Sequence, residues 1–369
     1  MPVGRRRFYS RGMQPRAKNS LDLSALIDSV ERNCAISDAR HAGDYTLCTY
    51  LLKMREFYRW EQEIPYFAEV PQADLGAWLT ARERRWDDLE EEPFGALPLA
   101  SGIDPFDSAV ANRYLVPQGF VYSGGYGRLR KPLFFLGRLL HAERRDGFEV
   151  LISSCEYARE LAAPPAMLQG DTIYVRQESA RRFVWEKVDE WRWNRQDNAM
   201  GRALAYFDFD RDPQAALEAM TTMAMDVMVQ HELGEGLVGH ALGEGWASLL
   251  AGLSRSRAEI VARAVRDHLA DCRSTVPFLL AADDPAAIHF YFANIDGVRR
   301  LLFPAFFAAY TQFAATRELA PLQRAIEADK AEWLARAQAV VRSFAADPAR
   351  AARELEAALP AETCNTRRQ

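Results

Sequence analysis

The segment that follows Asp212-Pro213 constrains the fold more than any other part of this chain. Aspartate at an N-cap with proline at the first helical position is a common helix start. Small and apolar residues then recur at helical spacing through Met220, Ala224 and Val227 as far as His231. The sequence therefore predicts a long helix whose buried face leads to a histidine.

The fourteen residues from His231 to Glu244 hold two of the six histidines and three glutamates, the densest group of potential metal ligands in the sequence. Residues four apart share a helix face, so His231 and Glu235 could offer a nitrogen and a carboxylate oxygen to one ion. His240 and Glu244 have the same spacing. Four glycines interrupt the stretch and a fifth, Gly245, follows it, and each costs a helix interior up to about 1 kcal/mol relative to alanine. We expect the helix to break beyond Gly236, which either brings the second pair to the first or aims it away.

The His-Glu pair at the start of this stretch has a distant likeness to the zincin motif His-Glu-x-x-His. In that motif two imidazoles bind zinc and the glutamate activates water. The likeness implies that His231 is the first ligand, Glu232 the general base and Glu235 a ligand in place of the second imidazole. Glu244 or His240 would complete the site. A carboxylate in place of imidazole hardens the donor set and favours iron or manganese over zinc.

A structural interpretation of the same residues is also open. His231 and His240 would then be hydrogen-bonded core or interface histidines. Glu232 and Glu235 would face solvent or pair with arginines, because buried carboxylates need a counter-charge to offset their desolvation.

A second cluster of potential ligands follows on the next predicted helix. His268, Asp271 and Cys272 are spaced i, i+3 and i+4, so they share a helix face and could supply further ligands. The alternative is a capped helix end ahead of Ser274 and Pro277.

The composition narrows the class of protein and its partners. With 369 residues, 49% hydrophobic and 26% charged, the chain has an ordinary globular composition for one large domain or two or three smaller ones. Residues 1–20 hold six basic side chains and no acid, so the formal charge of -5 leaves -11 over the rest. This acidic body disfavours nucleic acid as the main partner. The basic arm could touch RNA or an anionic surface, but a disordered, solvated tail is the expected state.

The sequence favours a cytoplasmic protein. Its five cysteines are widely spaced and form no Cys-x-x-Cys pair, as expected of reduced thiols. The N-terminus lacks the apolar core of a secretory signal, although its arginine-rich start has some likeness to a transit peptide. The longest apolar run, Leu301–Tyr310, is shorter than the roughly 20 residues that span a bilayer, so we expect no membrane contact.

The periodicity along the chain predicts an α+β fold that is mostly helical. Residues 22–67 are expected to form two helices and residues 75–92 another, with a connector to about residue 117. Ser179 is expected to cap a helix that ends near Trp193. A hairpin turn at Arg145-Asp146-Gly147 belongs to a small antiparallel sheet of about four strands in the middle of the chain, at 120–122, 133–141, 148–153 and 172–176. Further helices are expected at 257–272, 288–315, 322–344 and after Pro348.

These elements divide the chain into a basic arm and three structured regions. The regions are an N-terminal helical part over 21–115, a small β-sheet plus helix over 116–200, and a C-terminal helical part over 201–360 that holds the candidate metal site. The three could also form one continuous domain from 21 to 360.

Three segments resemble an uncharacterised family of bacterial proteins. They are the YLLKMREFYRWE-like helix at 50–61, the QHELGE motif at 230–235 and the Asp-Cys-Arg-Ser-Thr segment at 271–275. The resemblance attaches no activity. It implies only that the three segments belong to one constellation, which would bring Arg55, Glu56 and Arg59 near the ion.

The functional prediction is a metal-dependent enzyme in which a divalent zinc, iron or manganese ion activates water for attack on a carbonyl or related group. The predicted ligands are His231, Glu235, His240 and Glu244, with Glu232 as the acid/base. The residues expected around them are Glu56, Arg55, His268, Asp271 and Cys272. The alternatives are a redox enzyme that uses iron or manganese, and a non-catalytic protein that binds a ligand or partner. The substrate, a small molecule or a peptide, is not identified by the sequence.

Overall fold

A computed structural model describes residues 21–100, 102–127, 130–254, 256–295 and 297–359. The chain divides into two units, one made of residues 1–140 with 153–163 and the other of residues 141–152 with 164–369. The prediction of a solvated basic arm at residues 1–20 lies outside the described residues. Within those residues, no helix is long and apolar enough to cross a membrane.

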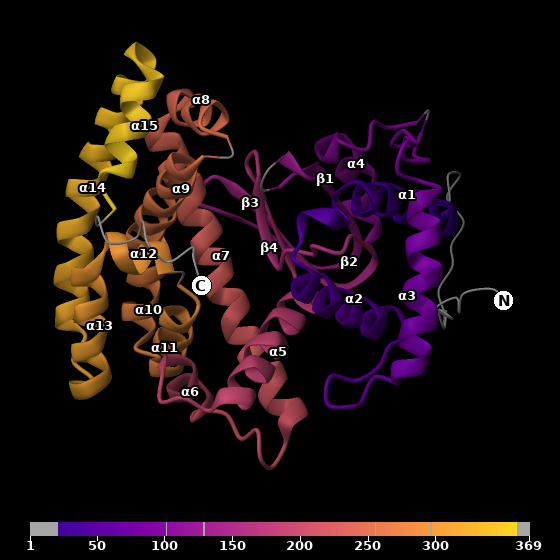
Figure 1. Ribbon diagram of the computed structural model, residues 1–369, viewed down its shortest axis with the longest axis horizontal. Helices are drawn as coiled ribbons and strands as arrows, with labels where there is room; N and C mark the ends of the chain where they lie inside the picture. Colours follow the sequence, from indigo (N-terminus) through magenta and orange to yellow (C-terminus); the bar gives the residue numbers. More distant parts are fainter. Residues whose placement is uncertain (1–20, 101, 128–129, 255, 296, 360–369) are drawn as a thin grey trace. The chain divides into compact units, whose positions relative to one another are not determined.

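The described helices of the first unit are α1 (Leu23–His41), α2 (Leu47–Glu61), α3 (Gln72–Asp87) and α4 (Ser108–Leu115), with short 3-10 turns η1 (Ala42–Asp44) and η2 (Val116–Gln118). Asp22 and Thr46 cap α1 and α2 with their side chains, which confirms the predicted pair of helices. α3 packs against both of them (Figure 1). α4 lies in the predicted connector. Its Asn112 amide exchanges two hydrogen bonds, of 2.8 and 2.9 Å, with the backbone of Tyr122, which fastens α4 to the first strand.

The described residues form a sheet of five strands in the order β1-β2-β3-β5-β4. The strands are β1 (Phe120–Tyr126), β2 (Pro132–Arg145), β3 (Phe148–Arg159), β4 (Ala166–Gln169) and β5 (Thr172–Arg176). The prediction of about four antiparallel strands is wrong in two respects, because the sheet is mixed and has a fifth strand. β1 with β2, and β4 with β5, are antiparallel. Glu149 at the start of β3 donates its N–H to Asp171 just before β5, at 2.9 Å, as expected for two strands that run in the same direction.

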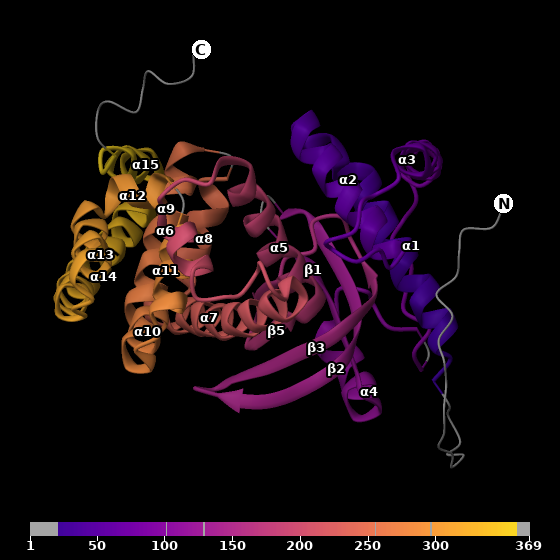
Figure 2. The same ribbon diagram turned by 90° about the horizontal axis from the view of Figure 1, so that it is seen from below.

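The turn between β2 and β3 forms where the sequence predicts it. Asp146 and Gly147 both have positive φ, 51° and 91°, which is the requirement of a two-residue hairpin turn with a primed geometry. Figure 2 shows β2 and β3 as the two long arrows of this hairpin.

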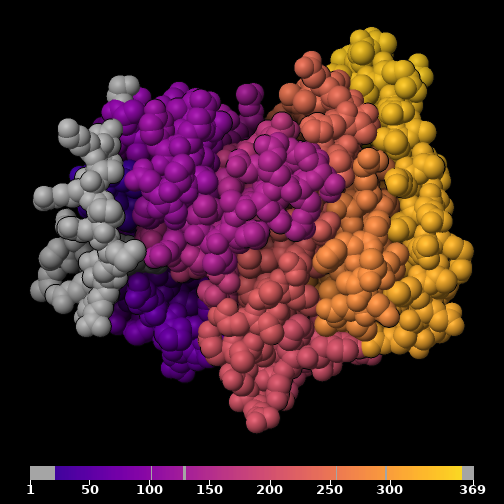
Figure 3. All heavy atoms as spheres, turned by 180° about the vertical axis from the view of Figure 1, so that it is seen from behind, coloured from indigo at the N-terminus to yellow at the C-terminus, as the bar shows by residue number. Residues whose placement is uncertain are grey.

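The described helices of the second unit run from α5 to α15. In chain order they are α5 (Gln177–Asn194), α6 (Ala199–Leu204), α7 (Pro213–Leu242), α8 (Glu244–Gly252), α9 (Arg257–Ala270), the π-helical turn η4 (Asp271–Thr275), α10 (Val276–Ala282), α11 (Pro285–Ala293), α12 (Gly297–Leu302), α13 (Pro304–Thr316), α14 (Ala320–Ala346) and α15 (Pro348–Glu356). α14 and α15 pack against α9, and they form the yellow edge of this unit in Figure 3.

Two predicted helix starts in this unit have different outcomes. Asp212 accepts a hydrogen bond from the N–H of Ala215 at 3.0 Å, so the predicted start of the long helix α7 is confirmed. The predicted cap at Ser179 is wrong. α5 begins two residues earlier, at Gln177, and Ser179 is a buried residue of its first turn.

The predicted break in α7 beyond Gly236 is also wrong, since the helix runs without a break over all 30 residues from Pro213 to Leu242. A Cβ at Gly234 would collide with the backbone of Ala270 in α9, and a Cβ at Gly236 would collide with the ring of Phe148 in β3. These glycines therefore allow close packing against α9 and the sheet, and the packing offsets their poor helix propensity. The helix ends at Gly243, which has a φ of 69°.

We predict that Gly234→Ala destabilises the protein by about 1–3 kcal/mol, because the colliding atoms belong to the backbone of α9 and cannot rotate away. Gly239→Ala is the matched control on the same helix. Nothing lies within 4 Å of a Cβ there, so this change should stabilise the protein by up to about 1 kcal/mol. Urea denaturation measures both. Equal effects of the two substitutions would contradict the packing role of Gly234.

Candidate functional site

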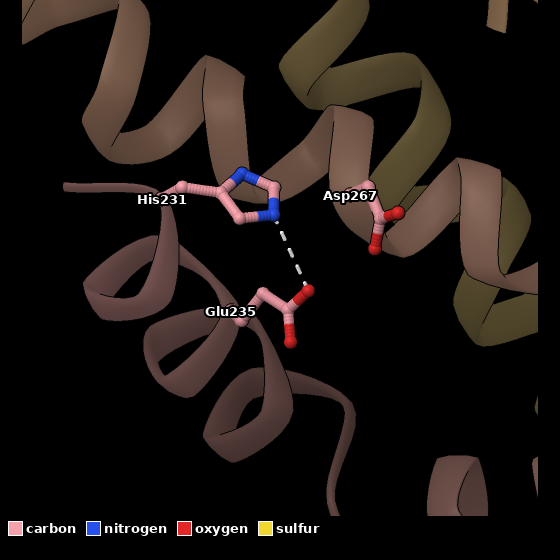
Figure 4. A group of neighbouring side chains, drawn as sticks. All are labelled: His231, Glu235 and Asp267. Carbon is pink, nitrogen blue, oxygen red and sulfur yellow. Dashed lines mark ion pairs between the residues drawn. The ribbon is translucent and has the colours of Figure 1, made fainter. Parts of the chain in front are cut away.

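The second unit brings several polar side chains together where α7 packs against α9 and η4. His231, Glu232 and Glu235 come from α7, and Asp267 and Arg266 come from α9. Figure 4 shows the imidazole of His231 and the carboxylate of Glu235 facing each other, with Asp267 beside them on the neighbouring helix. The side chains of His231 and Asp267 are each 28% exposed, so solvent reaches the cluster.

His231 lies between two carboxylates. Its Nδ1 is 2.7 Å from Asp271 Oδ1 and must donate, since a carboxylate only accepts. Its Nε2 is 3.4 Å from Glu235 Oε1. Burial opposes a charged imidazole, but Asp271 and Glu235 outweigh it and raise the pKa of His231 well above its usual value.

Asp271 is the buried anchor of the cluster, with a side chain only 1% exposed. Its carboxylate also accepts hydrogen bonds from Thr275 Oγ1 at 2.7 Å, Tyr291 OH at 2.8 Å and Arg299 Nη2 at 2.6 Å. Burial opposes its charge, yet Arg299 and His231 prevail and lower the pKa of Asp271 far below its usual range. The carboxylate is therefore ionised and held in one orientation.

Arg266 bridges the other two carboxylates. Its Nη2 is 2.6 Å from Glu235 Oε1 and 2.9 Å from Asp267 Oδ1, and its Nε is 3.2 Å from the same Asp267 oxygen. Burial opposes the Glu235 anion, but the hydrogen bond from His231 and the charge of Arg266 lower the pKa of Glu235 to about 2. Burial and the charge of Glu235 raise the pKa of Glu232 to about 7.

Three side chains of this cluster could hold a metal ion. One ligand atom each from His231, Glu235 and Asp267 lie within 4.8 Å of one another. The Nδ1 hydrogen bond to Asp271 leaves Nε2 to face the group, which is how histidine ligands are commonly oriented. One nitrogen and two carboxylate oxygens form a hard donor set that suits manganese or iron.

Two sequence-predicted ligands do not join this cluster. Because α7 continues without a bend, His240 lies nine residues further along it, roughly 13 Å by helix rise. The side chain of His240 is 66% exposed, stacks on Phe148 and lies 3.4 Å from Asp171. Glu244 is exposed at the start of α8.

The predicted His268, Asp271 and Cys272 cluster separates into two environments. Asp271 faces His231, whereas His268 is fully buried, stacks on Phe303 and pairs through Nε2 with Asp329 at 2.9 Å. Cys272 Sγ is 3.6 Å from the same nitrogen. Burial lowers the pKa of His268 and raises the pKa of the Cys272 thiol, so both groups stay neutral.

Comparison with protein families places the chain in one of them. Residues 25–176 match the N-terminal domain, and residues 181–362 the C-terminal domain, of a family of unknown function (DUF6866). The chain belongs to this family. The match shows no similarity to zincins. No curated protein and no solved structure matches the chain.

The residues of the cluster from His231 to Arg299 all lie in the matched C-terminal domain of DUF6866. Arg55, Glu56 and Arg59 lie in the N-terminal domain, where Glu56 accepts from Arg55 Nε at 2.7 Å and from Arg59 Nε at 3.1 Å. The idea that these three residues join the His-Glu stretch in one constellation stays a prediction.

Sequence reasoning did not find Asp267, Arg266, Tyr291 or Arg299 in the DUF6866 C-terminal domain. One signal was present for Asp267, which precedes Asp271 by four residues and so shares its helix face. Tyr291 and Arg299 lie on α11 and α12, and their spacing gives no sign that they meet Asp271.

We predict that Asp271→Asn destabilises the protein by about 3–5 kcal/mol near pH 7, because it leaves the buried Arg299 without its counter-charge. The folded-state pKa of Asp271 is lowered, so its stabilisation is present above the unfolded value, near pH 4, and is lost as the pH falls further. The difference between wild type and variant should therefore shrink from about pH 4 downward.

Urea denaturation of both proteins at about pH 7 and about pH 3 measures this difference. Asp171→Asn serves as the control, since Asp171 is 74% exposed and its contact with His240 is worth at most about 1 kcal/mol. A loss of equal size at both pH values would contradict the role of the Asp271 charge.

Proposed function

We propose that the protein is a metal-dependent enzyme whose divalent ion is held by His231, Glu235 and Asp267 and activates a water molecule. The observation that carries the proposal is the convergence of three donor atoms from α7 and α9 within 4.8 Å. Three protein ligands leave coordination positions open for water and substrate, as catalytic metal sites require.

The surroundings of His231 support this assignment. A ligating imidazole needs a fixed orientation, and the 2.7 Å hydrogen bond from Nδ1 to Asp271 provides it. Asp271 is itself held by Arg299, Tyr291 and Thr275. The hard donor set favours manganese or iron over zinc, so an iron- or manganese-dependent redox reaction is the closest alternative to hydrolysis.

Glu232 is the proposed general base. It directly follows His231 on α7, and the charges of Glu235 and His231 both act on the pKa of its carboxyl. A general base has to lie beside the ion that binds the water it deprotonates. The reaction would then be attack of the activated water on a carbonyl or related group.

Arg266 favours a second candidate function, a non-catalytic protein with a structural His/Glu network. Its guanidinium already supplies a counter-charge to Glu235 and Asp267. In that case the cluster stabilises the packing of α7 on α9, and the protein binds a ligand or partner elsewhere. Metal content separates the two functions.

The substrate and the compartment are also part of the proposal. We place the enzyme in the cytoplasm, because its five widely spaced cysteines suit a reducing compartment. Its substrate would be a small molecule or a peptide.

We predict that the full-length protein, purified without a histidine tag, contains close to one equivalent of manganese, iron or zinc by elemental analysis. His231→Ala and Asp267→Asn should each lose most of it, because each removes one of three ligands. His240→Ala is the matched control, since it removes an exposed histidine from the same helix and should leave the metal in place. Wild-type protein that takes up none of these metals, even after incubation with them, would end the proposal.

We predict that Glu232→Gln keeps the metal and lowers kcat by about 10²–10⁴-fold in any hydrolytic reaction that the wild type catalyses. The side chain keeps its size but can no longer accept a proton from water. A panel of ester, amide and phosphate substrates supplies the assay, and elemental analysis confirms the metal. Unchanged turnover would exclude Glu232 as the base, and loss of metal would make it a ligand.

A further inference from the structure

The carboxylates of the metal cluster already hold a cation that belongs to the protein. Arg266 makes three hydrogen bonds to Glu235 and Asp267, between 2.6 and 3.2 Å. It uses Oε1 of Glu235, the same oxygen that lies 3.4 Å from His231 Nε2. A metal bound between His231, Glu235 and Asp267 would therefore share both carboxylates with the guanidinium, and its charge would lie beside that of Arg266.

This overlap limits which ions can enter. A monovalent ion would replace one positive charge by another and would give up the directional hydrogen bonds of the guanidinium. A divalent ion brings twice the charge, and it also bonds to His231 Nε2. The guanidinium could donate a hydrogen bond to that nitrogen only where the nitrogen is unprotonated.

The position of Arg266 lets it leave without a rearrangement of the fold. Its side chain is 22% exposed, so part of it already borders solvent. The chain is long and unbranched, and its backbone stays fixed in α9 beside Asp267. Arg299, by contrast, is 8% exposed and is locked onto Asp271, so it cannot yield in the same way.

We propose that Arg266 regulates the metal site as a resident cation, which closes the site in the absence of metal and which only a multivalent ion displaces. The inference rests on the proposed function, since it concerns the same ligands. Arg266 then sets the threshold that an ion has to exceed, because it lowers the affinity of the site for every metal by the free energy needed to break its own contacts.

The experiment is a direct metal titration of the full-length, metal-stripped protein. Mn²⁺ binding is followed by the loss of the free-ion EPR signal, and Zn²⁺ binding by competition with a chelating dye. The variants are Arg266→Gln, which removes the cation, and Arg266→Lys, which keeps a charge but not the bridging geometry. The control is Arg263→Gln, which removes an arginine one turn earlier on α9 that pairs with Glu259 at 2.8 Å.

Arg266→Gln is expected to bind both ions about tenfold more tightly or more, which corresponds to about 1.4 kcal/mol per factor of ten. Arg266→Lys should fall between this variant and the wild type, and Arg263→Gln should match the wild type. Removal of Arg266 takes the guanidinium from Asp267 and leaves Glu235 with His231, so Arg266→Gln should also show the larger rise in Tm on addition of Mn²⁺. The rise in Tm can be measured even if metal-free Arg266→Gln is less stable than the wild type, so the test remains usable.

Each outcome decides between the two ideas. If the wild type binds metal and Arg266→Gln binds it equally or more weakly, the resident-cation role is overturned and the metal site stands. If only Arg266→Gln binds metal, no ion displaces the guanidinium in the wild type, so the displacement that we propose and the metalloenzyme are both overturned. If neither protein binds metal, both ideas are overturned.

Discussion

The close approach of α7 to α9 at Gly234 is the constraint on which the site depends. The Cα of Gly234 faces the backbone of Ala270, and any side chain there would push the helices apart. Glu235 directly follows Gly234, and His231 lies about one turn before it. In the same way, Asp271 directly follows Ala270, and Asp267 lies about one turn before it. The short separation of the two helices therefore fixes the distances between the ligand atoms. A side chain at position 234 would separate the two helices and hold the ligand side chains further apart.

The second determinant is the change of helical type at Asp271. α9 ends at Ala270, and the π-helical turn η4 begins with Asp271 before α10 continues. His268 turns toward Asp329 on α14, while Asp271 turns toward His231 on α7. Widened turns of this kind are often found at functional sites, where they redirect a side chain. Within four residues of chain, the buried His268 therefore faces α14 and the ionised Asp271 faces the charged cluster.

Local patterns were enough to predict much of the fold, but not the role of the glycines or the full ligand set. The Asp212-Pro213 start of α7 and the Asp146-Gly147 hairpin follow from local backbone preferences, so the sequence predicts them. β4 has only four residues and follows two prolines, which is too short for a periodic signal. Helix propensity alone predicts that the glycines of α7 break the helix, whereas the surface against which the helix packs decides their role. Arg266 meets Glu235 across 31 positions of the chain, and no local spacing encodes that contact.

The charges of the cluster explain why the same side chains suit either a network or a metal site. Glu232, Glu235, Asp267 and Asp271 face the two guanidinium groups of Arg266 and Arg299, so with His231 protonated there are four carboxyl groups against three cations. Protons make up the deficit without a metal, because burial and Glu235 raise the pKa of Glu232 to about 7. A divalent ion that replaces the imidazolium proton and displaces Arg266 keeps the positive charge of the cluster at three, and it places two of those charges directly on the ligands. The fold thus holds one carboxyl group more than the cluster has cations, at a point that solvent reaches, so the same side chains can balance their charge with a proton or bind an ion.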